Sequence, residues 1–167
     1  MWSKTVHPLA TEADAYNFCL DRLALRDHSS LELRQKLVER QCPEEMQQQV
    51  LTKLLQRHLV DDGRCADRVL ETWRRKKFYG RQYLRLMLQK RVIPQQEAAL
   101  VLESVAEEEE IERAEAFAQS VLAKLHRKYP GAEQQRKGKA ALARMLASRG
   151  FCSGAIAGTL SLWDGNE

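Results

Sequence analysis

The chain has 167 residues and a mass of 19.2 kDa, enough to bury a core without disulfide staples, which excludes a disulfide-rich miniprotein. Leu and Ala together number 42, whereas Val, Ile and Thr number 17, so the composition favours helices over strands. Charged residues make up 30% and mean hydropathy is -0.52. Because no apolar run approaches the roughly 20 residues that cross a bilayer, we expect a soluble protein that does not enter a membrane.

The N-terminal residues and the cysteines indicate where the protein works. Residues 1–16 contain no apolar segment typical of a secretory signal, so we expect a cytoplasmic protein. Cys19, Cys42, Cys65 and Cys152 are scattered, with no C-x-x-C pair. This spacing predicts reduced thiols, most of them in the core, with neither a disulfide framework nor a zinc site.

An internal repeat organises the sequence. Six residues of one segment recur 51 residues later, and four of them recur again after a further 58. The matching sets are Leu33, Leu37, Arg40, Pro43, Val50 and Leu51; then Leu84, Leu88, Arg91, Pro94, Val101 and Leu102; then Leu142, Leu146, Arg149 and Leu160. Such a repeat predicts an all-α protein of three tandem three-helix repeats, helix-turn-helix-like units that form an elongated, curved module.

Helix start and stop signals divide the chain in the same way. Ser29 with Glu32 predicts a capping box, Pro43 and Pro94 open third helices, and Asp61 or Asp62 caps the helix that follows. In the third unit we expect helices over 111–126, 134–148 and 153–163. The predicted organisation is a flexible segment at 1–10 and repeats at 11–59, 60–106 and 107–167.

Charge alternates in blocks along the chain. Residues 62–91 carry a net +7, residues 92–115 a net -7 and residues 116–149 a net +7. Basic blocks with aromatic residues among them are typical of phosphate, nucleic-acid or protein contacts, although basic side chains also line solvated helix faces and favour the C-terminal ends of helices. The candidate contact residues are Arg64, Arg68, Arg74, Arg75, Lys76, Lys77, Phe78, Tyr79, Arg81, Arg85, Lys90, Arg91, Arg136, Lys137, Lys139 and Arg144.

Catalytic motifs are missing from the sequence. It contains no phosphate-binding loop, no G-x-G-x-x-G, no G-x-S-x-G and no H-E-x-x-H motif. The pair Asp61 and Asp62 fits a helix cap better than a metal site, because carboxylates are favoured at helix starts. We therefore expect no catalytic residues, no metal and no cofactor.

Four stretches resemble the RecX family of bacterial regulatory proteins. They are LALRDHSSLELRQKL (23–37), LVDDGRCADRVL (59–70), YGRQYLRLMLQKRVI (79–93) and RMLASRGF (144–151). The resemblance runs from about residue 11 to the end of the chain. Cys65 stands where the family usually has Phe, and the acidic run Glu107 to Glu110 is not part of the family motif.

The resemblance implies three tandem three-helix repeats and a non-enzymatic regulator of the RecA recombinase. Such a regulator binds RecA and its filament on single-stranded DNA and inhibits ATP hydrolysis, strand exchange and coprotease activity, and thereby modulates recombination, DNA repair and the SOS response. The implied partners are RecA, its nucleoprotein filament and single-stranded DNA itself, bound by a monomer.

Two other classes of protein remain open. The last two helices of each repeat have the proportions of a helix-turn-helix, so a free-standing DNA-binding protein is an alternative. It would need base-reading side chains on one helix, yet the third helices carry Gln47 to Gln49 and Gln95 to Gln96 and few arginines. A catalytic protein is the third possibility, for which the sequence names no substrate.

Overall fold

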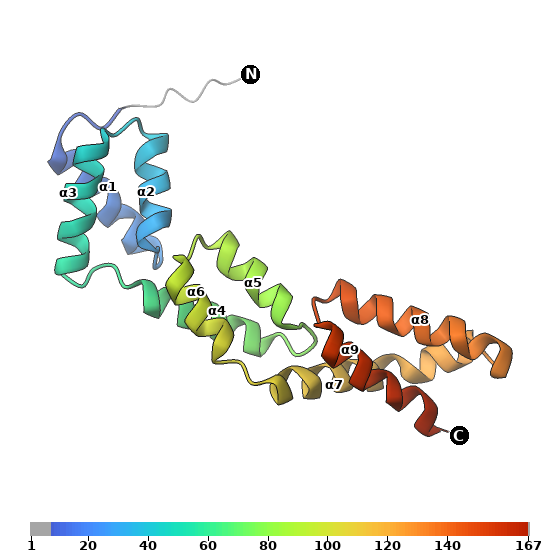
Figure 1. Ribbon diagram of the computed structural model, residues 1–167. Helices are drawn as coiled ribbons and strands as arrows, with labels where there is room; N and C mark the ends of the chain where they lie inside the picture. Colours follow the sequence, from blue (N-terminus) through green and yellow to red (C-terminus); the bar gives the residue numbers. More distant parts are fainter. Residues whose placement is uncertain (1–7, 167) are drawn as a thin grey trace, which may run out of the picture. The chain divides into compact units, whose positions relative to one another are not determined.

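The protein is all-helical in a computed structural model that describes residues 8–166 (Figure 1). Within these residues it has nine α-helices, a final 3-10 helix and no strand. The elements are α1 (Glu12–Leu25), α2 (Ser30–Glu39), α3 (Glu44–Gln56), α4 (Asp62–Arg75), α5 (Arg81–Lys90), α6 (Gln95–Glu103), α7 (Glu107–Lys128), α8 (Ala132–Ser148), α9 (Ser153–Thr159) and η1 (Leu160–Asn166). The helices follow one another in three groups of three, which confirms the predicted fold class. Most of the predicted flexible segment, residues 1–7, lies outside the described residues.

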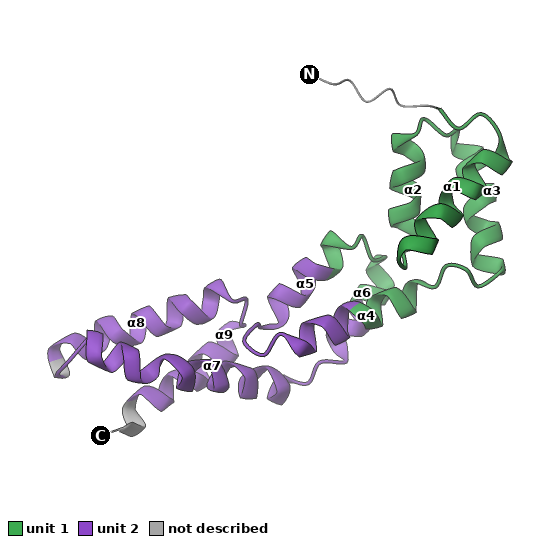
Figure 2. Cartoon of the chain, turned by 180° about the vertical axis from the view of Figure 1, so that it is seen from behind, with its two compact units in different colours: residues 1–68, 88–98 green, residues 69–87, 99–167 purple. Residues whose placement is uncertain are grey.

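The chain forms two compact units, drawn in two colours in Figure 2. Unit 1 contains residues 1–68 and 88–98, and unit 2 contains residues 69–87 and 99–167. The division runs through the helices of the middle group, α4, α5 and α6. The boundaries 11–59, 60–106 and 107–167 stay a prediction.

Helices α1, α2 and α3 supply most of the core of unit 1. Ala15 and Cys19 from α1, Leu33 and Leu37 from α2, and Val50 and Leu54 from α3 are all fully buried. Burial raises the pKa of the Cys19 thiol to about 12, so this cysteine is a neutral core residue at physiological pH. Cys42 and Cys65 are buried as well and Cys152 is half-buried, so most of the cysteines lie in the core, as predicted.

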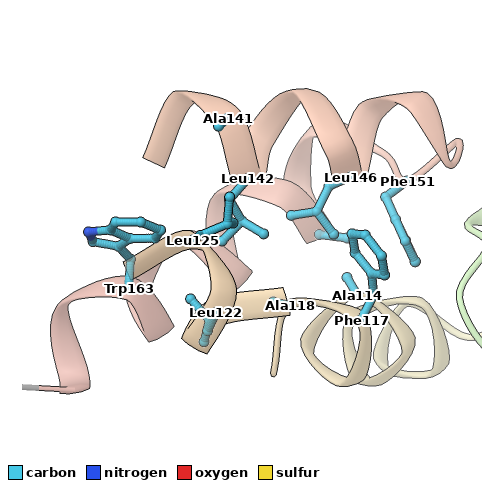
Figure 3. Packing of buried hydrophobic residues seen from close by; sticks show 11 residues of the cluster. Ala114, Phe117, Ala118, Leu122, Leu125, Ala141, Leu142, Leu146, Phe151 and Trp163 are labelled. Atoms are coloured by element: carbon cyan, nitrogen blue, oxygen red, sulfur yellow. The ribbon is translucent and has the colours of Figure 1, made fainter. Parts of the chain in front are cut away.

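Helices α7, α8 and α9 build the larger core of unit 2 (Figure 3). One face of α7 and one face of α8 meet there through Phe117, Leu122, Leu142 and Leu146. Trp163 closes the cluster and leaves no room for a side chain at position 138, because a Cβ atom built on Gly138 would lie 2.3 Å from the indole ring. None of the helices in the described part of the chain is both long and apolar enough to cross a membrane.

Three expectations about helix ends need correction. Helix α7 begins at Glu107, four residues before the expected start at residue 111, because carboxylates are favoured in the first turn of a helix. Helix α9 ends at Thr159 and continues as a 3-10 turn. Ser29 caps α2 as predicted by accepting a hydrogen bond from the Glu32 N–H at 3.1 Å, but the Glu32 carboxylate pairs with Arg26 instead of completing the capping box.

The middle helix of each group ends in the same turn. Gln41, Val92 and Gly150, which the 51- and 58-residue offsets make equivalent, have φ angles of 55°, 49° and 78°. In each case the N–H of this residue and the N–H of the next residue donate to carbonyl oxygens of the last helical turn, the hydrogen-bond pattern of a Schellman motif. The repeat in the sequence therefore corresponds to a turn that recurs at the end of each middle helix.

A carboxylate from the first helix of the following group caps the middle helix in each of the first two groups. In unit 1 the Ser30 N–H donates to Asp62 Oδ1 at 2.7 Å, and the Ser30 hydroxyl donates to Asp62 Oδ2 at 2.6 Å. In unit 2 the equivalent N–H, that of Arg81, donates to Glu110 Oε1 at 3.0 Å. A carboxylate from the start of a first helix thus binds the positive N-terminal end of the preceding middle helix. Asp61 caps α4 itself, by accepting from the Arg64 N–H at 2.8 Å.

Candidate interaction surface

The turn between α4 and α5 is held in place by Trp73 and Arg113, two residues that are not among the predicted contact residues. Trp73 on α4 is fully buried, and its indole N–H donates to the Gly80 carbonyl oxygen at 3.0 Å. The guanidinium of Arg113 lies 3.9 Å from the Trp73 ring centroid. It also donates to the carbonyl oxygens of Trp73, Lys76 and Tyr79. Burial lowers the pKa of Arg113. The carbonyl oxygens accept hydrogen bonds from the charged guanidinium and so stabilise it in this position.

Arg113 is the most important residue that sequence reasoning missed. The sequence feature that distinguishes Arg113 is that it is the single basic residue in the acidic block 92–115. A lone cation among eight carboxylates indicates a specific partner, although the sequence does not say that the partners are backbone carbonyls 34 to 40 residues away.

Several predicted contact cations of unit 2 are engaged within the protein. Arg74 pairs with Glu109 at 3.2 Å, and Arg75 lies 3.8 Å from Glu71. Arg81 donates to the Val105 carbonyl oxygen and lies beside Glu110. The run Glu107 to Glu110 therefore neutralises part of the basic block, and Glu110 is buried.

The aromatic residues after α4 form two small clusters. Phe78 packs against Phe117 with a ring-centroid distance of 5.8 Å, so it belongs to the edge of the unit 2 core. Tyr79 and Tyr83 lie 4.2 Å apart, and Arg149 lies 5.1 Å from the Tyr79 ring centroid. Lys76 Nζ lies 5.8 Å from the same ring centroid. These rings are half-buried and hold cations of the same chain.

Two predicted contact residues of unit 1 are also engaged. Arg68 pairs with Asp27. Arg91 donates from Nη2 to the Asp27 carbonyl oxygen at 2.8 Å. Both arginines therefore help to hold the turn that precedes α2.

Other predicted cations are exposed and make no ion pair or side-chain hydrogen bond with the side chains that the structure describes. They are Arg64 on α4, Lys77 after it, Arg85 and Lys90 on α5, and Arg136, Lys137 and Arg144 on α8. Lys139 is half-buried and makes an interaction within the protein.

A groove brings the α8 cations together. It has a volume of about 490 Å³ and is lined by Tyr129, Arg136, Lys137, Ala140 and Arg144; we call it the α8 groove. Residues 136, 137, 140 and 144 fall within about 100° of the helix circumference, because successive residues turn by about 100°. The opposite face of α8, with Leu142 and Leu146, faces the core (Figure 3). Tyr129 and Ala140 are the two lining residues that are not among the predicted contact residues.

The site lacks the residue clusters expected of a metal centre. No group of three or more His, Cys, Asp or Glu side chains suited to a metal lies within residues 8–166. The geometry shows instead exposed cations on helices whose opposite faces are buried. The fold and the surface thus define a class: a helical repeat protein with basic faces.

Comparison with known proteins finds relatives that share the three-helix domain. Residues 15–54 match the family described as RecX, first three-helix domain. The chain is 37% identical over 94 residues to the Regulatory protein RecX of Cronobacter sakazakii, an alignment that covers 47% of this chain and 56% of that protein. It is 32% identical over 91 residues to the Regulatory protein RecX of Chlorobium limicola, covering 54% of this chain and again 56% of the relative. The matched region thus spans little more than half the length of these curated relatives.

Solved structures share the fold over more of the chain. The crystal structure of RecX from Lactobacillus salivarius superposes with a TM-score of 0.76 at 20% identity, covering 92% of this chain and 96% of that chain. A second structure, described as a crystal structure of regulatory protein RecX, gives a TM-score of 0.69 at 26% identity and covers 87% of this chain and 71% of that one. The chain is thus similar to RecX regulatory proteins in sequence over about half of its length, and in fold over most of it.

Proposed function

We propose that the protein regulates the RecA recombinase by binding RecA and its filament on single-stranded DNA. Binding would inhibit ATP hydrolysis, strand exchange and coprotease activity, and would thereby modulate recombination, DNA repair and the SOS response. The proposed site of action is the cytoplasm, where the recombinase meets DNA, and the proposed active form is a monomer. Its effect would come from binding rather than from catalysis.

One observation in the structure supports this proposal most directly. The exposed cations of α8 have no acidic partner among the side chains that the structure describes, whereas the acidic run pairs with Arg74 and Arg81. Such surfaces attract polyanions and acidic protein faces over several ångströms. The similar proteins are named regulatory proteins, which supports a regulatory activity. The exposed cations of α8 are the groups that would contact DNA or an acidic protein surface.

The helix-turn-helix alternative is less well supported. A reader of duplex sequence needs arginine, lysine or amide side chains along one recognition helix. Helices α6 and α9 contain no Lys or Arg, the one cation of α3 is Lys53, which pairs with Glu12, and the cations of α8 lie on the second helix of their group. We therefore favour binding to backbone phosphates and to a protein partner over readout of base sequence.

The test is the DNA-dependent ATPase of RecA, measured with increasing amounts of this protein at two salt concentrations. Inhibition at amounts well below one molecule per RecA protomer, persisting when single-stranded DNA is in excess, is the expected result. Inhibition that disappears with excess DNA would show competition for phosphate and would favour the DNA-binding alternative. No inhibition at any ratio would overturn the proposal.

A further inference from the structure

The α8 groove combines two features that nucleic-acid sites use together. Arg136, Lys137 and Arg144 are exposed, and no described residue neutralises them. Tyr129 contributes an aromatic ring to the same groove from the end of α7. Cations track a phosphodiester backbone, while an aromatic face accepts a stacked base.

The spacing of the cations suits a short length of strand. Arg136 and Arg144 are eight residues apart on one helix, which corresponds to about 12 Å along its axis. Ala140 lies between them on the same face, and its small side chain leaves the middle of the groove open. A chain of phosphates can therefore follow α8 without meeting a large side chain at its centre.

The aromatic wall is fixed in place. Tyr129 is half-buried, packs against the unit 2 core, and its N–H donates to the Leu125 carbonyl oxygen at 2.9 Å. Lys128 Nζ lies 5.4 Å from the ring centroid and places a further positive charge beside the ring. A ring held in this way loses little conformational entropy when a base stacks on it.

We infer that the α8 groove is a binding site for single-stranded DNA, in which Arg136, Lys137 and Arg144 contact the phosphates and Tyr129 stacks on a base. Single-stranded DNA is favoured over duplex because a base must be unpaired and unstacked to lie on the ring. This inference rests on the proposed function, since it names the DNA contact of the same regulator. The proposed DNA contact lies at the α8 groove and not at the turn between α4 and α5, because Arg74, Arg75 and Arg81 pair with acidic residues of the same chain.

The first experiment measures the salt dependence of binding without recombinase. A fluorescein-labelled oligo(dT) strand is titrated with the full chain, and anisotropy is followed at several salt concentrations. For a single strand the slope of log K against log salt is about -0.7 per phosphate contact. The double variant Arg136→Gln/Arg144→Gln should therefore flatten the slope by about 1.4.

A matched control separates the groove from net charge. Lys124→Gln/Arg127→Gln also removes two exposed cations of unit 2, from α7 and outside the groove. This control should leave the slope within about 0.3 of the unsubstituted protein, because neither residue contacts the proposed strand. An equal change of slope in both double variants would overturn the inference, since binding would then depend only on net charge.

The second experiment tests the stack. Tyr129→Phe keeps the aromatic face and Tyr129→Leu keeps apolar volume without it, so both variants preserve most of the contact with the core. Tyr129→Leu should weaken binding to oligo(dT) about fivefold or more, while Tyr129→Phe should bind like the original protein. Equal affinities of the two variants, or tighter binding of a duplex than of the single strand, would overturn the inference.

The two proposals can fail separately. If the protein inhibits the RecA ATPase but the Arg136→Gln/Arg144→Gln variant binds oligo(dT) normally, the DNA site is wrong and the proposed function stands. If the groove variants lose oligo(dT) binding but the original protein never inhibits RecA, the proposed function is wrong and the DNA site stands.

Discussion

Arg149 makes in unit 2 the contact that Arg91 makes in unit 1. Arg91 Nη2 donates to the Asp27 carbonyl oxygen at 2.8 Å, and Arg149 Nη1 donates to the Phe78 carbonyl oxygen at 3.4 Å. The two donors are 58 residues apart, the offset of the later repeat, and the two acceptors are 51 residues apart, the offset of the earlier one. The repeat therefore preserves the junction between successive three-helix groups as well as the core pattern.

Gly80 allows the unit 2 junction to close. A Cβ atom at this position would lie 2.4 Å from the Gly150 carbonyl oxygen and 2.4 Å from Phe151 Cα, and neither backbone atom can move aside alone. Gly80→Ala should lower the free energy of unfolding of unit 2 by about 2–3 kcal/mol. Urea unfolding followed by fluorescence of the buried Trp73 and Trp163 measures this change.

Gly158→Ala is the control for that substitution. A Cβ atom there meets nothing within 4 Å, and the residue lies in α9. Its unfolding free energy should stay the same or rise by up to about 1 kcal/mol, because alanine favours the helix. A loss in Gly80→Ala no larger than the change in Gly158→Ala would contradict the close-approach argument.

Glu110 and Glu109 are neighbours that should respond very differently to substitution. Glu110 is 1% exposed, and its Oε1 accepts hydrogen bonds from the N–H groups of Arg81 and Cys152, each at 3.0 Å. Glu110→Ala leaves both donors without this acceptor and should cost about 3 kcal/mol of unfolding free energy. Glu109→Ala removes only the exposed pair with Arg74 and should cost less than about 1 kcal/mol. Chemical denaturation of both variants gives the comparison, and equal losses would contradict the junction role of Glu110.

The sequence was sufficient to predict the helices because their signals are local. Ser29, Pro43 and Pro94 mark helix starts, and the repeat of Leu33 at Leu84 and Leu142 marks buried faces. The start of α7 was placed late because the prediction followed the first apolar residue instead of the acidic turn before it.

The interaction surface was predictable only in part, because charge pairing is a tertiary property. Arg74 and Arg144 look alike in sequence, yet Arg74 meets Glu109, 35 residues away, while Arg144 meets no acidic residue in the described chain. Tyr129 was missed because it lies seven residues before Arg136, on a different helix end. No spacing rule joins the end of one helix to the middle of the next.

Val92 occupies a conformation that suits glycine. Its φ is 49°, the left-handed region that is unfavourable for a β-branched side chain, and the equivalent residue in the third group is Gly150. Val92→Gly should raise the unfolding free energy of unit 1 by about 1 kcal/mol, because relief of backbone strain exceeds the loss of a half-buried side chain. Val38→Gly, a substitution at an exposed position within α2, should instead lower it by about 1 kcal/mol. Amide hydrogen exchange of α2 measures both changes, and a loss of protection in Val92→Gly would contradict the prediction.

Unit 1 should lose stability as the pH falls from 7 toward 4. Burial lowers the pKa of His28 from its ordinary 6.5, so the folded state holds a neutral imidazole whose Nδ1 lies 3.0 Å from the Arg26 carbonyl oxygen. Burial would raise the pKa of Glu32, but the hydrogen bond from Arg26 and the positive charges of Arg26 and Arg91 outweigh it and bring this pKa below 4.5. For both groups the unfolded chain binds more protons at acidic pH, so protonation favours unfolding. The loss begins as the pH falls below about 6.5 for His28 and below about 4.5 for Glu32.

His28→Gln separates the two contributions. It removes the titration of position 28, so the dependence of unfolding free energy on pH should flatten between pH 7 and pH 5 while the fall below pH 4.5 remains. Amide exchange of α2 at a series of pH values, corrected for the intrinsic exchange rate, follows unit 1 directly. A His28→Gln variant with the same pH dependence as the original protein between pH 7 and pH 5 would show that His28 is not the group that titrates there.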